Sequence, residues 1–207
     1  ATSISAGPAD ESAQILSFSL SNNNNGLFAV QPAINPTGTL SYTPAANVSG
    51  NATVNVILSD NGGVANGGDN NSSATFTITV TAINDPPVAV NDNASGNEDT
   101  NISVNVIAND TDIDGNGTIS ANTVDLNPGI AGIQTTTTNA NGSFSVNSSG
   151  VVTFVPNTNY SGATSISYTV NDTDGATSNI ATINFTVNTV NDPPIAADDA
   201  ATGNEDN

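Results

Sequence analysis

Short segments in which apolar and polar residues alternate recur along the chain. They are rich in Val, Ile and Thr and are bounded by Gly, Asn, Asp and Pro, a combination typical of β-strands and turns. The predicted strands are ILSFSL (15–20), TLSYTP (39–44), ATVNVIL (52–58), ATFTITV (74–80), NISVNVI (101–107), VVTFVP (151–156), SISYTV (165–170) and ATINFTV (181–187). No stretch keeps apolar residues at helical spacing, so the sequence predicts an all-β protein made of β-sandwiches.

The chain also contains an internal repeat. GTLSYTPAANVSGNATVNVILSD (38–60) aligns without gaps with GVVTFVPNTNYSGATSISYTVND (150–172). Farther along, INDPPVAVND (83–92) corresponds to VNDPPIAADD (190–199). GNEDT (96–100) corresponds to GNEDN (203–207). The repeating unit is therefore a whole domain.

The two NDPP segments mark the predicted domain boundaries. Consecutive prolines lack backbone donors and restrict the preceding residue, so they favour a short, stiff, extended linker. We expect a first domain over 1–86 that lacks its own first strand, and a complete domain over 87–193. Residues 194–207 repeat the start of the second domain, and we expect them to form the first strand of a following one.

Composition removes many function classes. The 207 residues include 19 Asp and Glu but no Lys, Arg, His or Cys, giving a formal net charge of -19. Thiolate or imidazole metal sites, disulfides and Ser-His or Cys-His catalysis are thereby excluded. Direct binding to nucleic acid is excluded too, because affinity for phosphates depends on cationic side chains. No apolar run is long enough to span a membrane as a helix.

The acidic residues are concentrated. Seven of the 19 carboxylates lie between Asp85 and Asp114. Oxygen donors at this density suit calcium, which accepts six to eight oxygens in irregular geometry. The alternative is that these acids are ordinary turn residues, since Asp and Asn are common turn formers.

Several motifs together resemble the tandem cadherin-like, immunoglobulin-like repeats of large bacterial surface proteins and adhesins. They are the INDPP and VNDPP linkers, the GNED segments, DTDIDGNG (110–117), and the SDNGG and NDTDG loops. The resemblance implies two tandem seven-strand sandwiches with calcium at the junctions between domains. It also implies that further copies of the repeat follow one another head to tail.

The resemblance implies three sets of calcium ligands. Asn84, Asp85, Asp110, Asp112 and Asp172 would converge at the junction of the two domains. Glu98, Asn191 and Asp192 would converge at the far junction, and Asp10, Glu11 and Asp60 occupy the corresponding places upstream. The strand at 101–107 separates Glu98 from Asp110 by roughly 20 Å at about 3.3 Å per residue, which assigns them to opposite ends of one domain.

Catalytic interpretations find little support. DTDIDG (110–115) resembles the start of an EF-hand loop, but no Glu stands at the twelfth position. A glycosidase would need two carboxylates in a cleft, usually lined by aromatic residues, and the chain has three Tyr and no Trp. The nine Phe and Tyr residues are better interpreted as core fillers, and no enzymatic activity is predicted.

Three functions remain open from the sequence. The leading hypothesis is an extracellular structural repeat in a bacterial cell-surface stalk, filament or adhesin, stiffened by calcium. The second is a module that binds a sugar or protein through a loop such as GGVANGGDNNSS (62–73). The third is a homophilic adhesive contact.

The two ends of the chain complement each other in sequence. If Asn207 of one copy preceded Ala1 of another, Glu205 would lie twelve positions before Asp10, the same interval that separates Glu98 from Asp110. We therefore expect a head-to-tail array, either covalent, which the polar tail favours, or formed by strand donation. Residues 195–207 would pair with the open sheet edge of the next first domain, with Glu205 near its Asn84 and Asp85.

Overall fold

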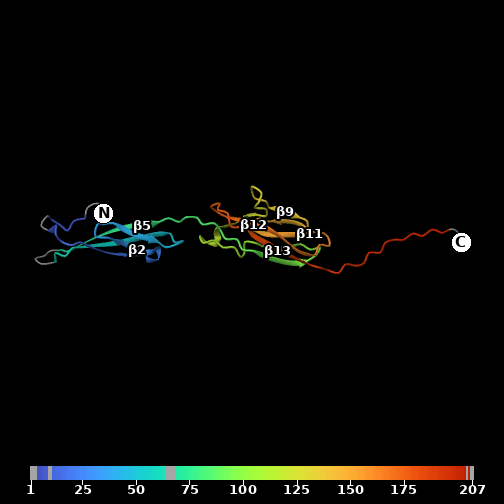
Figure 1. Cartoon of the computed structure of the whole chain (residues 1–207), viewed down its shortest axis with the longest axis horizontal. Helices are drawn as coiled ribbons and strands as arrows, with labels where there is room; N and C mark the ends of the chain where they lie inside the picture. Colours follow the sequence, from blue (N-terminus) through green and yellow to red (C-terminus); the bar gives the residue numbers. More distant parts are fainter. Residues whose placement is uncertain (1–3, 9–10, 64–68, 204, 206–207) are drawn as a thin grey trace. The chain divides into compact units, whose positions relative to one another are not determined.

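The chain folds into two compact units, Ala1–Ile83 and Asn84–Asn207, in a computed structural model (Figure 1). The structure describes residues 4–8, 11–63, 69–203 and 205. The division falls before NDPP, whereas the predicted boundary follows its first proline. Asn84 and Asp85 belong to the second unit because both form hydrogen bonds within it.

The first unit is a small sandwich of two antiparallel sheets. Its strands are β1 (Ser17–Asn22), β2 (Phe28–Ile34), β3 (Leu40–Pro44), β4 (Gly50–Ser59) and β5 (Asn71–Val80), with a short 3-10 turn at Asn25–Leu27. One sheet has the order β1-β4-β5, and the other consists of β2 and β3. Alternation places Ala52, Val54 and Val56 of β4 on the buried face, where they pack with Leu27, Phe28 and Ile78.

The second unit is a larger sandwich. Its strands are β6 (Asp92–Asn97), β7 (Ile102–Asn105), β8 (Ile119–Asp125), β9 (Thr136–Asn139), β10 (Gly142–Val146), β11 (Val151–Pro156), β12 (Gly162–Asp172) and β13 (Ala181–Asn188), with a 3-10 turn at Asn116–Thr118. One sheet has the order β6-β13-β12-β8 and the other β7-β11-β10-β9. Every strand pair is antiparallel except β6 and β13, which run parallel.

Aromatic side chains from both sheets fill the core of the second unit. Phe144 of β10 stacks on Phe154 of β11 with ring centroids 4.5 Å apart. Phe185 of β13 faces Phe154 from the opposite sheet at 5.2 Å. All three are buried, so these rings form part of the core that joins the two sheets.

The predicted all-β sandwich fold is confirmed, with differences in strand content. The described residues of the second unit form eight strands where seven were expected. The additional strand, β9, consists of Thr136–Asn139 and pairs with β10 across a tight turn. The segment 194–207 was predicted as the first strand of a following domain. Residues 194–203 form no strand within this chain, and residues 204, 206 and 207 lie outside the described residues.

Replacing Phe154 with Ala should lower the free energy of unfolding of the second unit by about 3–5 kcal/mol. The substitution removes a fully buried ring that contacts both Phe144 and Phe185. Calorimetry of the full chain would measure the loss. Ile180→Ala is the matched control, because that side chain is 64% exposed and should change stability by less than about 0.5 kcal/mol. Similar losses in both variants would contradict this assignment of the core.

Candidate functional site

Three segments meet at the end of the second unit where the linker enters. We call them the rim: the linker 84–88 and the loops 110–118 and 172–176. Val88 and Thr111 exchange backbone hydrogen bonds of 2.7 and 3.1 Å. The backbone N–H of Thr173 donates to the carbonyl of Thr118 at 2.8 Å. The linker is thereby fixed to one loop and that loop to the other.

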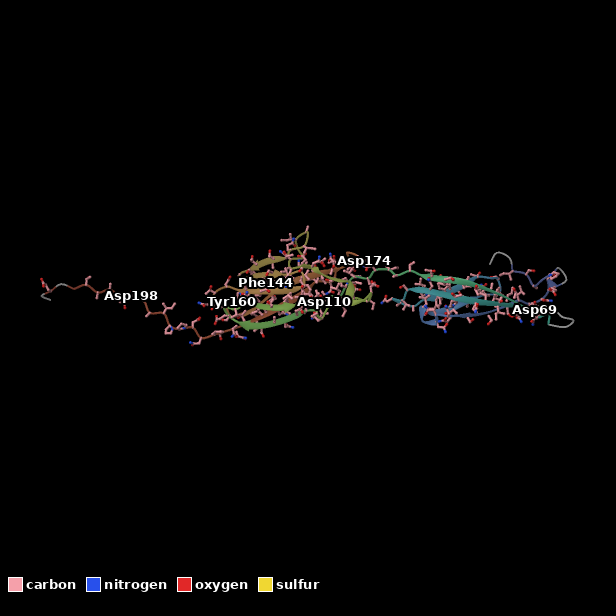
Figure 2. The ribbon with its side chains drawn as sticks, turned by 180° about the vertical axis from the view of Figure 1, so that it is seen from behind. Asp69, Asp110, Phe144, Tyr160, Asp174 and Asp198 are labelled. Atoms are coloured by element: carbon pink, nitrogen blue, oxygen red, sulfur yellow. The ribbon has the colours of Figure 1, made fainter. Side chains whose placement is uncertain are left out.

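Asp172 lies at the centre of one half of the rim. The side-chain amide of Asn84 donates to its Oδ2 at 2.8 Å, and the N–H groups of Asp174 and Ala176 donate to its Oδ1 at 2.9 and 2.8 Å. The hydrogen bond from Asn84 is the main cause of a lowered pKa for Asp172. Asp172 therefore remains an anion that accepts hydrogen bonds from neutral donors. Figure 2 shows Asp174, two residues farther along the same loop.

The other half of the rim links Asp112 to the linker through Asp114. Asp112 accepts from the N–H of Asp114 at 2.9 Å and from the hydroxyl of Thr118 at 2.7 Å. Asp114 in turn accepts from the backbone N–H of Asp85 at 2.8 Å. Asp114 was absent from the predicted ligand set, although the DTDIDG motif that singled out Asp112 contains it.

Asp110 contacts the interior of the sandwich. Its Oδ1 accepts from the N–H of Val90 at 2.8 Å and from the hydroxyl of Tyr168 at 3.0 Å. Tyr168 is completely buried, and its hydroxyl also lies 3.1 and 3.0 Å from the carbonyls of Val90 and Val106. One hydroxyl proton is thus surrounded by three acceptors.

Asp92, at the start of β6, lies beside the same hydroxyl and forms an inner carboxyl pair with Asp110. Asp92 is 6% exposed and Asp110 3%, and the Oδ2 atom of each has no hydrogen-bond partner. Burial, with a smaller contribution from the charge of Asp110, raises the pKa of Asp92 to about 6. Burial likewise raises the pKa of Asp110. Burial also raises the pKa of Tyr168, so its hydroxyl stays protonated.

Sequence reasoning missed Asp92 and interpreted Tyr168 only as a core filler. The repeat contained a usable signal, because Asp92 corresponds to Asp199 when the two NDPP segments are aligned. An acid kept at the same place in both segments could have been examined for a buried role.

At the opposite end of the second unit, Glu98 is buried and holds the start of the outgoing segment. Its Oε1 accepts from the N–H of Val190, and its own N–H donates to the carbonyl of Asn188 at 2.9 Å. Asn191 and Asp192 follow directly and are exposed, with the Asn191 amide 3.2 Å from the Asp192 carbonyl. Glu205 is exposed in a turn.

The upstream end of the first unit shows turns. Asp60 accepts from the N–H of Gly62 at 2.8 Å, a common turn interaction of Asp. The N–H of Glu11 donates to the carbonyl of Pro8 at 2.9 Å. Asp10 lies outside the described residues.

The donor chemistry fits calcium, but the ligands are not preassembled. Within the described residues, no three acidic side chains converge into a group that could hold a metal ion. The rim carboxylates instead accept hydrogen bonds from loop and linker amides. All of them are hard oxygen donors of the type that calcium prefers.

A family model described as the bacterial cadherin-like domain matches residues 84–189. The chain belongs to this family. The matched region begins at the rim linker and includes every strand of the second unit from β6 to β13. Bacterial cadherin-like domains are adhesion-type extracellular repeats without enzymatic activity. A comparison with curated protein sequences finds no match.

A comparison with solved structures finds cadherin ectodomains and a glycoside hydrolase. Human protocadherin-24 EC1-2 is 20% identical, with a TM-score of 0.52 over 90% of this chain and 85% of that one. Chicken VE-cadherin EC1-2 is also 20% identical, with a TM-score of 0.40 over 90% and 88%. An endo-fucoidan hydrolase of glycoside hydrolase family 107 is 17% identical, with a TM-score of 0.31 over 86% of this chain and 24% of the enzyme. At 20% identity, the likeness to protocadherin-24 shows the fold alone.

No helix in the described part of the chain has the length and apolar character needed to cross a membrane.

Without added calcium, the second unit should become more stable as the pH falls from 8 to 5. The raised pKa of Asp92 means that its contribution is fully present below 3.8 and is lost as the pH rises through about 6. The lowered pKa of Asp172 acts oppositely, because its contribution is present above 3.8 and is lost on further acidification. Thermal unfolding in chelator across this range measures both trends.

Asp92→Asn should remove much of the rise between pH 8 and 5 and should stabilise the unit at pH 8 by about 1–3 kcal/mol. The exposed Asp198→Asn is the control and should leave the pH profile unchanged. An Asp92→Asn profile identical to that of the wild type would show that the inner carboxyl pair does not control this pH dependence.

Proposed function

We propose that the chain is a structural repeat segment of an extracellular bacterial stalk, filament or adhesin, and that calcium at the domain ends stiffens it. The observation that supports this proposal most strongly is the attachment of the linker to both rim loops. Asn84 contacts Asp172 and the backbone of Asp85 contacts Asp114, so the segment that enters the unit is held by carboxylates.

The predicted ligands form the basis of three proposed sites. The rim set is Asn84, Asp85, Asp110, Asp112 and Asp172, and we add Asp114 to it because Asp114 accepts a hydrogen bond from the linker. Asp110 brings a carboxylate oxygen that has no hydrogen-bond partner. The downstream set is Glu98, Asn191 and Asp192, with Glu205 as the repeat counterpart of Glu98, and the upstream set is Asp10, Glu11 and Asp60.

Charge supplies the physical reason for stiffening. The chain contains no side-chain cation, so its clustered carboxylates repel one another. When bound, calcium would neutralise the rim and join linker and loop oxygens through several ligands at once. Without it, neutral donors alone hold the linker, as in the pairs Asn84–Asp172 and Asp85–Asp114.

Successive repeats are proposed to follow one another head to tail. The segment 191–206 restates 84–99 almost residue for residue, so a repeat that follows this one would meet the same linker chemistry. The proposed partners are therefore further copies of the same repeat, joined covalently or by strand donation. The proposed task is to provide length and stiffness at the cell surface.

Calcium should raise the melting temperature of the second unit and reduce the flexibility of the chain in small-angle scattering. Ligand concentrations about 100-fold above Kd would stabilise the folded state by about 2.7 kcal/mol. Asp112→Asn and Asp172→Asn should each abolish most of the difference between calcium and chelator, because each removes a rim carboxylate. The readout is that difference, so effects on intrinsic stability cancel.

Asp69→Asn provides the matched control. Asp69 is an exposed acid in the first unit that accepts a hydrogen bond from the N–H of Asn71, and it belongs to none of the proposed sites (Figure 2). This variant should keep the full calcium response. Identical melting and scattering in calcium and in chelator for the unmodified chain would end the calcium proposal.

A further inference from the structure

The sheet of the first unit has an open edge at β5. Among the described strands, β5 pairs with β4 on one side and with none on the other. Its repeat counterpart in the second unit is β13, since ATFTITV (74–80) aligns with ATINFTV (181–187). There β13 pairs with β12 on one side and with β6, in parallel, on the other. An unpaired edge exposes backbone donors and acceptors to a further strand.

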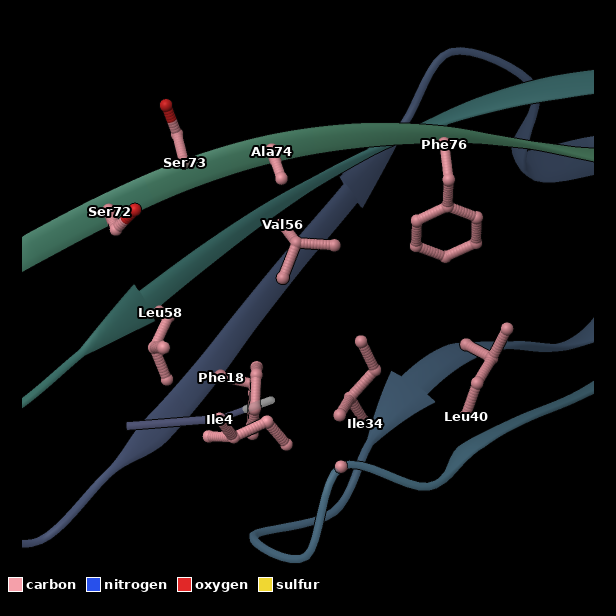
Figure 3. A pocket seen from close by; sticks show the side chains of 11 residues that line it. Ile4, Phe18, Ile34, Leu40, Val56, Leu58, Ser72, Ser73, Ala74 and Phe76 are labelled. Carbon is pink, nitrogen blue, oxygen red and sulfur yellow. The ribbon is translucent and has the colours of Figure 1, made fainter. Parts of the chain in front are cut away.

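Beside this edge the first unit is incompletely filled. A cavity of about 400 Å³ lies between its two sheets. Figure 3 shows apolar side chains from both sheets around it, and its lining includes Phe18, Ile34, Leu40, Val56, Leu58 and Phe76. The repeat alignment explains the cavity, because Val56 occupies the position that corresponds to Tyr168 of the second unit. A smaller side chain leaves the space that the ring fills in the other unit.

Apolar residues of β5 are also more exposed than the residues at the corresponding positions of β13. Phe76 and Val80 are only half-buried, whereas their counterparts Ile183 and Val187 are 0% and 3% exposed. In the second unit, β6 lies along the corresponding edge of β13, and Ala94 of β6 packs against the core. Within the described residues, no strand covers the apolar side of β5 as β6 covers that of β13.

The chain itself contains a segment that matches β6. NDPPIAADDAATGNED (191–206) aligns with NDPPVAVNDNASGNED (84–99), which places Asp199, Ala201 and Gly203 at the positions of Asp92, Ala94 and Gly96. Residues 195–203 are exposed and form no strand, and Ile195 is 97% exposed. This segment has the sequence of an edge strand without its sheet.

We infer that residues 195–203 of a second copy of this chain bind to β5 as a parallel strand. The β6–β13 register, transferred through the repeat, pairs Asp199 with Phe76, Ala201 with Ile78 and Gly203 with Val80. Side chains alternate along the strand, so Asp199 and Ala201 face the cavity side while Asp198 and Thr202 face outward. The inference rests on the proposed head-to-tail arrangement and specifies its contact.

Cysteine cross-linking tests this register, because the chain contains no Cys. Thr186 and Ser95 pair in the second unit, and their counterparts are Thr79 and Thr202. A mixture of Thr79→Cys and Thr202→Cys chains should form disulfide-linked dimers under mild oxidation. The register control replaces Thr79→Cys with Thr77→Cys, which moves the thiol two residues along the strand, about 7 Å and beyond disulfide reach.

The cross-links also identify the occupant of the edge. A chain carrying both Thr79→Cys and Thr202→Cys should give a ladder of oligomers, since each copy would donate to the next. A cross-linked monomer would show that the tail folds onto its own first unit and would overturn the inference. Equal yields in the two registers, or no dimer in either, would overturn it as well.

A second variant tests the cavity. Asp199→Leu replaces a carboxylate that faces apolar side chains with an apolar group, and it should lower the dissociation constant of self-association about tenfold or more in sedimentation experiments. Asp198→Leu adds the same side chain on the outward face and should leave the constant within about twofold. Equal effects of the two variants, or weaker association of Asp199→Leu, would refute the register.

These outcomes are separable from the calcium proposal. The cross-links form at β5, which contains none of the proposed ligands, and they should form both in calcium and in chelator. A calcium response that persists without register-specific dimers would refute only the strand contact. Specific dimers without any calcium response would refute only the calcium sites.

Discussion

The structure depends on one constraint, which is that nineteen carboxylates share a chain without any side-chain cation. Ion pairs between side chains are impossible, so the acids are held by neutral donors, chiefly the backbone N–H groups of their own loops. Asp172 accepts two such N–H groups and Asp112 accepts one. Asp125 repeats the arrangement by accepting from the N–H groups of Asn127 and Gln134. Hydrogen bonds to the carboxylates therefore stabilise the loop conformations. The repulsion among the carboxylates remains, and a bound cation would reduce it.

The eight strands predicted from alternating β-branched residues, such as ATVNVIL and ATINFTV, each coincide with a strand of the structure, whereas residues 194–203 form none. Alternation alone did not predict the strands with weaker patterns, although β6 lies in the first strand that the repeat predicted for the second domain. β6 reads DNASGN and has no large apolar residue, so its place in the sheet comes from parallel pairing with β13. β9 consists of Thr and Asn and depends on its hairpin partner β10. Tertiary pairing determines such strands, and a local pattern cannot reveal it.

The candidate site was predictable in its residue types and only partly in its grouping. The family resemblance grouped Asn84, Asp112 and Asp172 near a domain end, and the rim contains all three. Asp110 and Asp112 are two residues apart, yet Asp110 contacts Tyr168 whereas Asp112 contacts Thr118. That difference depends on a buried tyrosine hydroxyl from β12, more than fifty positions away in sequence. Spacing along the chain carries no information about such a partner.

The parallel pairing of β6 with β13 determines how the second unit would respond to tension. These are the first and last strands of the unit, and they lie side by side over six residue pairs from Ile183–Asp92 to Asn188–Asn97. A pull on the two ends would draw β6 toward its amino end and β13 toward its carboxyl end. The pairing would then be loaded in shear, so its hydrogen bonds would have to break together, whereas a hairpin pulled from its open end would unzip one bond at a time. Resistance to such a load depends on the rate of unfolding.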